Sequence, residues 1–296
     1  MLQVVTNALV LSSVYLLFAL GLSIAWGTIG IVNFAHGSIF MFSAFAGYLV
    51  LGELQLPMVV LLLLGAAAGA LLSVLGYVLI FEPILRRARN HTAGELQLLI
   101  GGLGFAGILL ALAQHKTRST PFGFSRSSFE LQTFTVAGVQ VTNVQIVIVL
   151  LGVGLTSILA VWLRKSRIGL ALRAIGQDAD TARMMGANQH SLAVLTVAIS
   201  GALAGISGVM LTFAYTSINP DTGDHLLLKG FAIVVFGGVG SLLGGVIGAV
   251  VLASAETIVL MNTTGMWVDA ISFGLIMVIL LVRPSGLLAR PEVRRT

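Results

Sequence analysis

Residues 144–163 read VQIVIVLLGVGLTSILAVWL, a run of 20 positions without an ionisable side chain. An α-helix rises about 1.5 Å per residue, so about 20 apolar residues are needed to cross the roughly 30 Å hydrocarbon core of a membrane. Four further stretches are comparably apolar: Leu9–Trp26, Met58–Phe81, Leu192–Phe213 and Trp267–Val282. The sequence therefore predicts an all-α, polytopic transmembrane bundle that forms a single domain over residues 1–296.

The composition excludes a soluble protein. Of the residues, 57% are hydrophobic and 9% are charged, whereas soluble domains carry roughly a quarter charged residues. We interpret the net charge of +5 as loop lysines and arginines that fix the topology, and we expect no nucleic-acid partner. There is no cysteine, so neither a disulfide nor a cysteine-based metal site can form. The N-terminus lacks a positively charged segment, and Leu9–Trp26 is expected to be a retained first span.

The basic residues predict the topology. Lysine and arginine gather in three places, which should be cytoplasmic because positive loops stay inside. These clusters are Arg86, Arg87 and Arg89; Arg164, Lys165, Arg167, Arg173 and Arg183; and Arg283, Arg290, Arg294 and Arg295. Two spans, Gln97–Ala113 and Val144–Leu163, separate the first two clusters, which is the even number that a return to the same side requires.

The same parity applies between the second cluster and the tail. Leu192–Phe213, Leu243–Met261 and Trp267–Val282 supply three crossings, so a fourth must come from the short run Leu226–Val239. This run is a short crossing or a re-entrant element, and a re-entrant element would put the basic tail outside. The sequence thus favours the crossing and predicts about eight or nine spans in an inner membrane. It leaves open on which side of the membrane the N-terminus lies.

Two glycine-rich interruptions occur in corresponding places of the two halves. The first extends from Trp26 to Ser38 and the second from Phe236 to Ser241, and each ends in Gly-Ser before a new apolar run, from Ile39 and from Leu242. A serine there can cap the following helix. Non-helical backbone survives in a membrane only where it is buried in protein or lines a wet cavity, and paired breaks in a transporter indicate the substrate path. The alternative is a pair of structural kinks without solute contact.

The candidate path residues follow from these breaks, together with one intramembrane acid. His36 can hydrogen-bond a neighbouring backbone carbonyl or take part in gating or solute contact. Glu256 is either functional, as intramembrane carboxylates usually are, or close enough to the interface to reach water. The predicted path comprises Asn33, His36, Gly37, Ser38, Gly237, Gly238, Gly240, Ser241 and Glu256.

Other glycines repeat every four residues and predict close helix packing rather than a site. They are Gly65 and Gly69; Gly201 and Gly205; and Gly240, Gly244 and Gly248. The chain has no phosphate-binding loop of the Gly-x4-Gly-Lys-Ser/Thr type and no His-Glu-x-x-His or Gly-x-Ser-x-Gly motif. These absences disfavour a membrane enzyme, and we expect no cofactor and no metal.

The polar connection from about residue 164 to 190 is predicted to contain a structured element. Residues 173–188 predict a short amphipathic helix that is closed by Gly186. Asp180-Thr181-Ala182 followed by Gly186 is similar to the Glu-Ala-Ala-x3-Gly loop of bacterial ABC importer permeases, and in that family the loop docks on an ATPase subunit. The resemblance implies coupling roles for Arg173, Asp178, Asp180, Ala182 and Gly186.

Several further motifs resemble branched-chain amino-acid permeases of the LivH type, in the expected order along nearly the whole chain. They are Gly30–Ser38, Ile218–Pro220, Phe236–Ser241, Ala255-Glu256 and Arg283–Val293. The resemblance implies a membrane-embedded permease that works with a second homologous permease, two ATP-binding subunits and an extracytoplasmic solute-binding protein. Leucine, isoleucine, valine or a related amino acid would be the solute.

Three alternatives stay open on the sequence alone. Urea and short-amide permeases share nearly the same signatures. A free-standing ion-coupled transporter or channel would need ion ligands or a proton relay within the spans, for which Glu256 is the one candidate. A receptor or assembly scaffold would carry no solute.

Overall fold

The computed structural model describes residues 2–51, 55–87, 91–124, 129–136 and 138–262, together with positions 267, 268, 270, 272–274, 277 and 281. Within these residues, six helical segments are long and apolar enough to cross a membrane: Leu2–Ile29, Met58–Arg87, Ala93–Thr117, Asn143–Lys165, Gln189–Tyr215 and Leu242–Asn262. Each contains or closely matches a span that hydropathy predicts. The chain is therefore a multi-pass, all-α membrane protein.

The long helices are α1 (Leu2–Ile29), α5 (His91–Thr117), α6 (Asn143–Lys165), α9 (Gln189–Tyr215), α11 (Leu242–Asn262) and the segment made of α3 (Met58–Gly76), the π-helical turn η1 (Tyr77–Phe81) and α4 (Glu82–Arg87). Two 16-residue helices also lie among the described residues: the apolar α2 (His36–Leu51) and α10 (Thr222–Gly237), which contains most of the short run predicted at residues 226–239. The predicted span at 267–282 and the basic tail lie largely or wholly outside the described residues.

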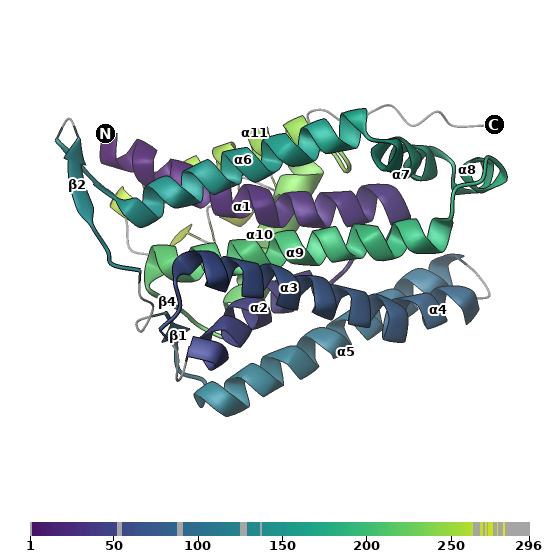
Figure 1. Cartoon of the computed structure of the whole chain (residues 1–296), viewed down its shortest axis with the longest axis horizontal. Helices are drawn as coiled ribbons and strands as arrows, with labels where there is room; N and C mark the ends of the chain where they lie inside the picture. Colours follow the sequence, from purple (N-terminus) through teal and green to yellow (C-terminus); the bar gives the residue numbers. More distant parts are fainter. Residues whose placement is uncertain are drawn as a thin grey trace.

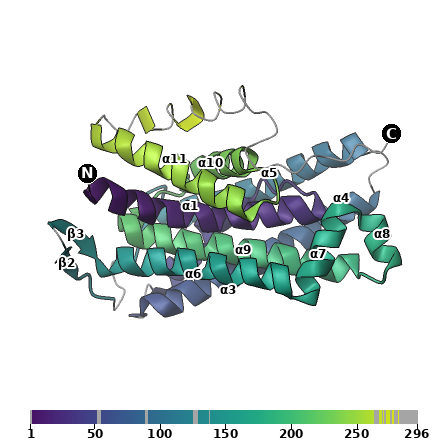
Figure 2. The ribbon, with the colours of Figure 1, turned by 90° about the horizontal axis from the view of Figure 1, so that it is seen from above.

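Helix α1 forms the centre of the bundle. All its residues from position 10 to 25 are buried, whereas α3, α5 and α6 expose large apolar side chains such as Leu63, Ile100 and Leu150. In Figures 1 and 2, α1 runs between α6, α9 and α11. A helix that is apolar on all sides must be covered on all sides by protein or lipid, and here protein covers α1 while the outer helices keep faces for lipid.

The two ends of the bundle differ (Figures 1 and 2). At one end lie α4, α7 (Arg167–Gln177) and α8 (Ala179–Met184), which we call the α7–α8 end. At the other, the strand end, lie the start of α1, the hairpin of β2 (Thr133–Val136) and β3 (Val139–Thr142), and the short pair of β1 (Phe122–Gly123) and β4 (Ser217–Ile218). The clusters of Arg86 and Arg164 share the α7–α8 end, which agrees with the parity predicted for them.

Glycines bring α3 and α9 into backbone contact. Gly65 faces Gly205, and Gly69 faces Gly201, so that a Cβ atom added to either member of a pair would meet the carbonyl group of the other. Because lipid provides little hydrophobic drive between helices, such close approach is how small residues stabilise membrane bundles. The packing interpretation of these two repeats is confirmed.

Candidate translocation site

A buried ion pair lies near the middle of the bundle. Lys229 Nζ of α10 is 3.0 Å from Glu256 Oε1 of α11, and the two side chains are 10% and 2% exposed. The Tyr15 hydroxyl of α1 donates to Glu256 Oε2 at 2.6 Å, and the Ser272 hydroxyl lies 2.6 Å from Oε1. Since Tyr15 is at the midpoint of the 28-residue α1, this network is far from either helix end.

The pairing of Lys229 with Glu256 keeps both charges neutralised inside the membrane. An ionised side chain at mid-depth is costly unless a partner neutralises it, and removal of one partner from a buried pair typically costs about 3–5 kcal/mol. The interpretation that Glu256 extends to the interface is wrong, because its carboxylate points to three partners inside the protein. Sequence reasoning missed Lys229 and Tyr15, although a lone lysine within the apolar stretch 226–239 was a usable signal for the partner of Glu256.

A cavity of about 360 Å³ lies on the side of the pair that faces the strand end. Lys229 and Tyr15 belong to its lining, and more exposed residues such as Tyr215 and Asn219 form its outer part. The remaining lining residues are Leu11, Pro121, Leu211, Ser217, Ile218, Thr222, His225 and Leu226. Among these residues, all of them described, there is no aspartate or glutamate. The cavity thus combines leucine walls with a cationic floor.

In the first glycine break, polar side chains hold the backbone. Asn33 Oδ1 accepts from the Ala35 N–H at 2.9 Å, and this bond closes the turn from which α2 begins. His36 is fully buried, and its Nε2 donates to the Phe18 carbonyl at 3.1 Å, while Nδ1 has no hydrogen-bond partner among the described residues. The backbone-carbonyl alternative for His36 is therefore realised. The predicted cap at Ser38 is wrong, because α2 starts two residues earlier and Ser38 lies in its first turn.

The second break is a tight turn between α10 and α11. Gly238 and Gly240 have φ angles of 91° and 76°, which favour glycine. The predicted cap is present here, since Ser241 Oγ accepts from the Gly244 N–H at 3.1 Å. The turn packs on α1: the Gly240 N–H donates to Ser23 Oγ at 3.1 Å, and a Cβ added to Gly27 would lie 2.8 Å from Gly240 Cα.

The structure does not gather the predicted path residues into one site. Gly37 contacts Gly223 at the start of α10, and Gly237 contacts Gly244 across the α10–α11 turn. None of the nine residues lines the cavity, and Glu256 is connected to it through Lys229 and Tyr15. A path along the two breaks stays a prediction.

The segment at the α7–α8 end differs from the single helix predicted for residues 173–188. Asp178 has an extended backbone, ends α7 and caps α8 by accepting from the Thr181 N–H at 2.9 Å. The chain therefore forms two short helices. Gly186, with a φ of 89°, follows the end of α8, as predicted.

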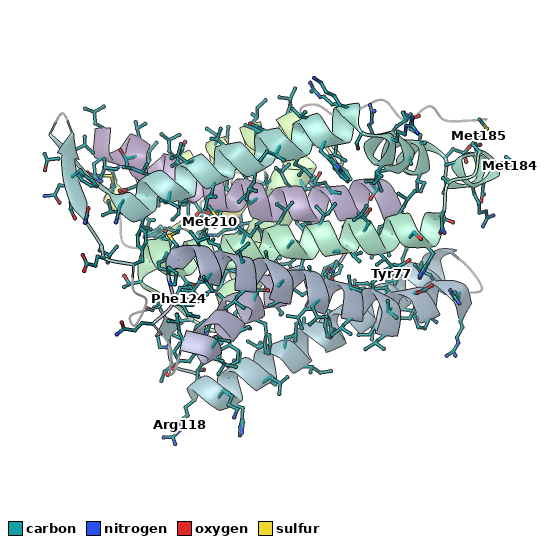
Figure 3. All side chains as sticks on the ribbon, viewed as in Figure 1. Tyr77, Arg118, Phe124, Met184, Met185 and Met210 are labelled. Atoms are coloured by element: carbon teal, nitrogen blue, oxygen red, sulfur yellow. The ribbon has the colours of Figure 1, made fainter. Side chains whose placement is uncertain are left out.

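The five residues proposed for coupling occupy different environments. Arg173 donates to the carbonyl oxygens of Gly169 and Arg164, Asp178 caps α8, and Ala182 is buried. Asp180, paired with Arg183 at 3.2 Å, and Gly186 are exposed. Sequence reasoning missed Met184 and Met185, which are 80% and 85% exposed. Figure 3 shows both methionines at the outer end of the bundle, beyond α9.

Comparison with known proteins gives a consistent result along the chain. Residues 4–281 match the family described as "Branched-chain amino acid transport system / permease component". The high-affinity branched-chain amino acid permease protein BraD of Pseudomonas aeruginosa is 31% identical, over 99% of this chain and 97% of its own. The LivH permease of Escherichia coli K12 is 29% identical over the same shares.

More distant relatives carry other names. The fructose import permease protein FruF of Bifidobacterium longum is 27% identical over 82% of this chain and 66% of its own. No solved structure gives a significant match. On the full-length agreement, the chain belongs to the family of branched-chain amino-acid ABC transport permeases.

Proposed function

We propose that the chain is a permease subunit of an ATP-driven importer that carries branched-chain or related amino acids across the inner membrane. Its partners would be a second homologous permease, two ATP-binding subunits and an extracytoplasmic solute-binding protein. Solute would enter through the cavity at the strand end, and ATP hydrolysis on the partner chains would act at the α7–α8 end.

The observation that carries the proposal is the exposed tip of α8. A short helix held by the Asp178 cap and closed by Gly186 presents Met184 and Met185 away from the bundle. Among the described residues, these two methionines are almost fully exposed and pack against little of the chain, and methionine is enriched where proteins associate. This arrangement suits a segment that docks in a groove of another protein, as the similarity to ABC importer loops implies.

The charge of the cavity favours amino acids over the alternative solutes. A lysine ammonium on its floor suits a solute with a carboxylate, which urea, short amides and sugars lack. The ion-coupled alternative loses its main support, because the Glu256 carboxylate is already paired with Lys229.

The topology follows from the same proposal. If the α7–α8 end is cytoplasmic, the start of α1 and the strand end face outwards. The six long helical segments, the two 16-residue helices and the segment at 267–282 would then give nine crossings, which is the upper of the two predicted numbers.

The test is purification of the chain from its native membrane in mild detergent, followed by reconstitution into vesicles. We expect a second permease and ATP-binding subunits to accompany it, and leucine uptake to require ATP and the solute-binding protein. A chain that purifies without ATP-binding subunits, or a complete complex that moves no amino acid, would contradict the proposal.

The exposed methionines give a sharper prediction. We expect the double change Met184→Ser and Met185→Ser to weaken retention of the ATP-binding subunits about tenfold, as the loss of one or two central contacts does at protein interfaces. Co-purification at matched expression measures this. The control is Leu131→Ser with Phe134→Ser, which replaces two exposed apolar side chains at the strand end, 63% and 45% exposed. Equal retention by the two variants would exclude docking at α8.

A further inference from the structure

The ion pair and the cavity form one structure, with Lys229 exposed to the cavity and Glu256 behind it. Lys229 and Tyr15 line the cavity, whereas Glu256 is absent from the lining and contacts both of these residues. The ammonium of Lys229 is also 3.4 Å from the Tyr15 hydroxyl and 5.8 Å from the centroid of the Tyr15 ring. A solute that descends into the cavity therefore meets a cation first and an anion directly behind it.

Helix periodicity places apolar side chains around that charge. Leu226 stands three positions before Lys229 on α10, Leu11 four before Tyr15 on α1, and Leu211 four before Tyr215 on α9. Residues three or four apart share a helix face, so the three helices direct both leucines and polar groups to the same cavity. Its volume of about 360 Å³ is at the small end of the roughly 300–1,000 Å³ usual for ligand sites.

We propose that the Lys229–Glu256 pair is a binding site for an amino-acid zwitterion, which it takes up by exchange of partners. The solute carboxylate replaces Glu256 on the Lys229 ammonium, the solute ammonium takes the freed Glu256 carboxylate, and the leucines receive the aliphatic side chain. This inference rests on the proposed function and adds the residues that recognise the solute.

Charge balance supports the exchange. The closed pair and the zwitterion are each neutral overall, so the mixed arrangement leaves no charge unpaired. A solute with a single charge would strand one member of the pair in a buried environment, which is strongly unfavourable. A neutral sugar or amide could replace neither partner. The closed pair also keeps the empty site neutral, so that α10 and α11 stay together before solute arrives.

The experiment compares two double variants with the wild-type complex in vesicles, with the solute-binding protein and ATP supplied equally. In the first, Lys229→Gln with Glu256→Gln, both charges are removed. In the second, Lys229→Glu with Glu256→Lys, the pair is kept but the carboxylate is at the cavity. Single changes are avoided because they leave one buried charge unpaired. The matched control is Glu82→Gln with Arg86→Gln, a pair at the α7–α8 end whose atoms are 2.6 Å apart.

Both double variants should assemble with the ATP-binding subunits, because each leaves no net buried charge. We expect leucine uptake at sub-saturating concentration to fall at least about tenfold in both, since charge-assisted contacts to the solute are lost or reversed. The control should transport as the wild type does.

The outcomes separate the inference from the proposed function. If the wild type transports leucine and the swapped variant retains most of that uptake, the pair is only structural and the inference is overturned, while the proposed function stands. If the wild-type complex transports no amino acid, the proposed function itself fails. Assembled double variants with lost uptake would establish the site.

Discussion

Replacing Gly201 by valine is expected to reduce folded protein in the membrane to below about a tenth of the wild-type amount. A Cβ atom at Gly201 would meet the Gly69 carbonyl oxygen and would lie 2.5 Å from Ser73 Cβ. The Gly69 backbone cannot turn away, because it belongs to the regular helix α3. Overpacking of a tight core typically lowers stability by about 1–3 kcal/mol, occasionally more. We expect the cost at Gly201 to be at the upper end of this range, because the added atoms would contact backbone on both helices. A loss of that size is a large part of the roughly 5–15 kcal/mol that stabilises a typical fold.

Gly107→Val provides the matched control on α5. Among the described residues, no other part of the chain comes within 4 Å of a Cβ at Gly107, so the same change in side chain should leave the folded amount close to that of the wild type. Size-exclusion profiles in detergent and a thermal unfolding midpoint measure both variants. If Gly201→Val matched Gly107→Val in amount and midpoint, the glycine contact between α3 and α9 would not be needed for folding.

The sequence was informative wherever one segment determined its own structure. The long spans were predictable because about 20 consecutive apolar residues have few stable arrangements other than a crossing helix. The start of α2 was predicted too late, since the Asn33 side chain closes the preceding turn on Ala35 and lets the helix begin before the Gly-Ser pair. The α7–α8 segment was predicted as one helix, because the capping preference of Asp178 was outweighed by the amphipathic pattern around it.

The cavity could not be predicted in the same way. Its walls come from α1, α9, α10 and the strand end, and no local pattern records which faces of those elements meet. Glu256 was recognised as a candidate because a carboxylate within a span is rare, but its partner lies 27 positions earlier, beyond a glycine turn. Lys229 carries the same kind of signal. Had both intramembrane charges been considered together, the requirement for neutrality would have indicated the pair.

Gly176→Val is expected to lower ATP-driven uptake roughly a hundredfold, near the upper limit of coupling between separate sites, while the complex stays assembled and basal ATPase activity persists. A Cβ at Gly176 of α7 would lie 2.5 Å from the Gly27 carbonyl oxygen at the end of α1, and Gly27 in turn packs on Gly240. These contacts join backbone to backbone, so a Cβ at Gly176 must displace the short helix α7 as a unit. At Gly201, by contrast, the clash lies between two long helices of the bundle. The turn at 238–241 connects α10 to α11, and Lys229 lies eight residues before Gly237, about 12 Å along α10. A movement of α7 can therefore reach the helices that hold the buried pair.

Gln177→Val is the control, because it places the same side chain at the next position of α7, which is exposed as Gly176 is. It should leave uptake within about twofold of the wild type, as surface changes usually have small effects. The comparison separates transmission from docking: Gly176→Val should keep its ATP-binding subunits, whereas the methionine variant of α8 should lose them. Normal uptake by Gly176→Val would mean that α7 can move away from α1 without consequence, and the α7–α1 contact would then have no part in coupling. If Gly176→Val instead lost its ATP-binding subunits, Gly176 would belong to the docking surface. A defect in the α7–α1 contact behind that surface would stop uptake without releasing these subunits.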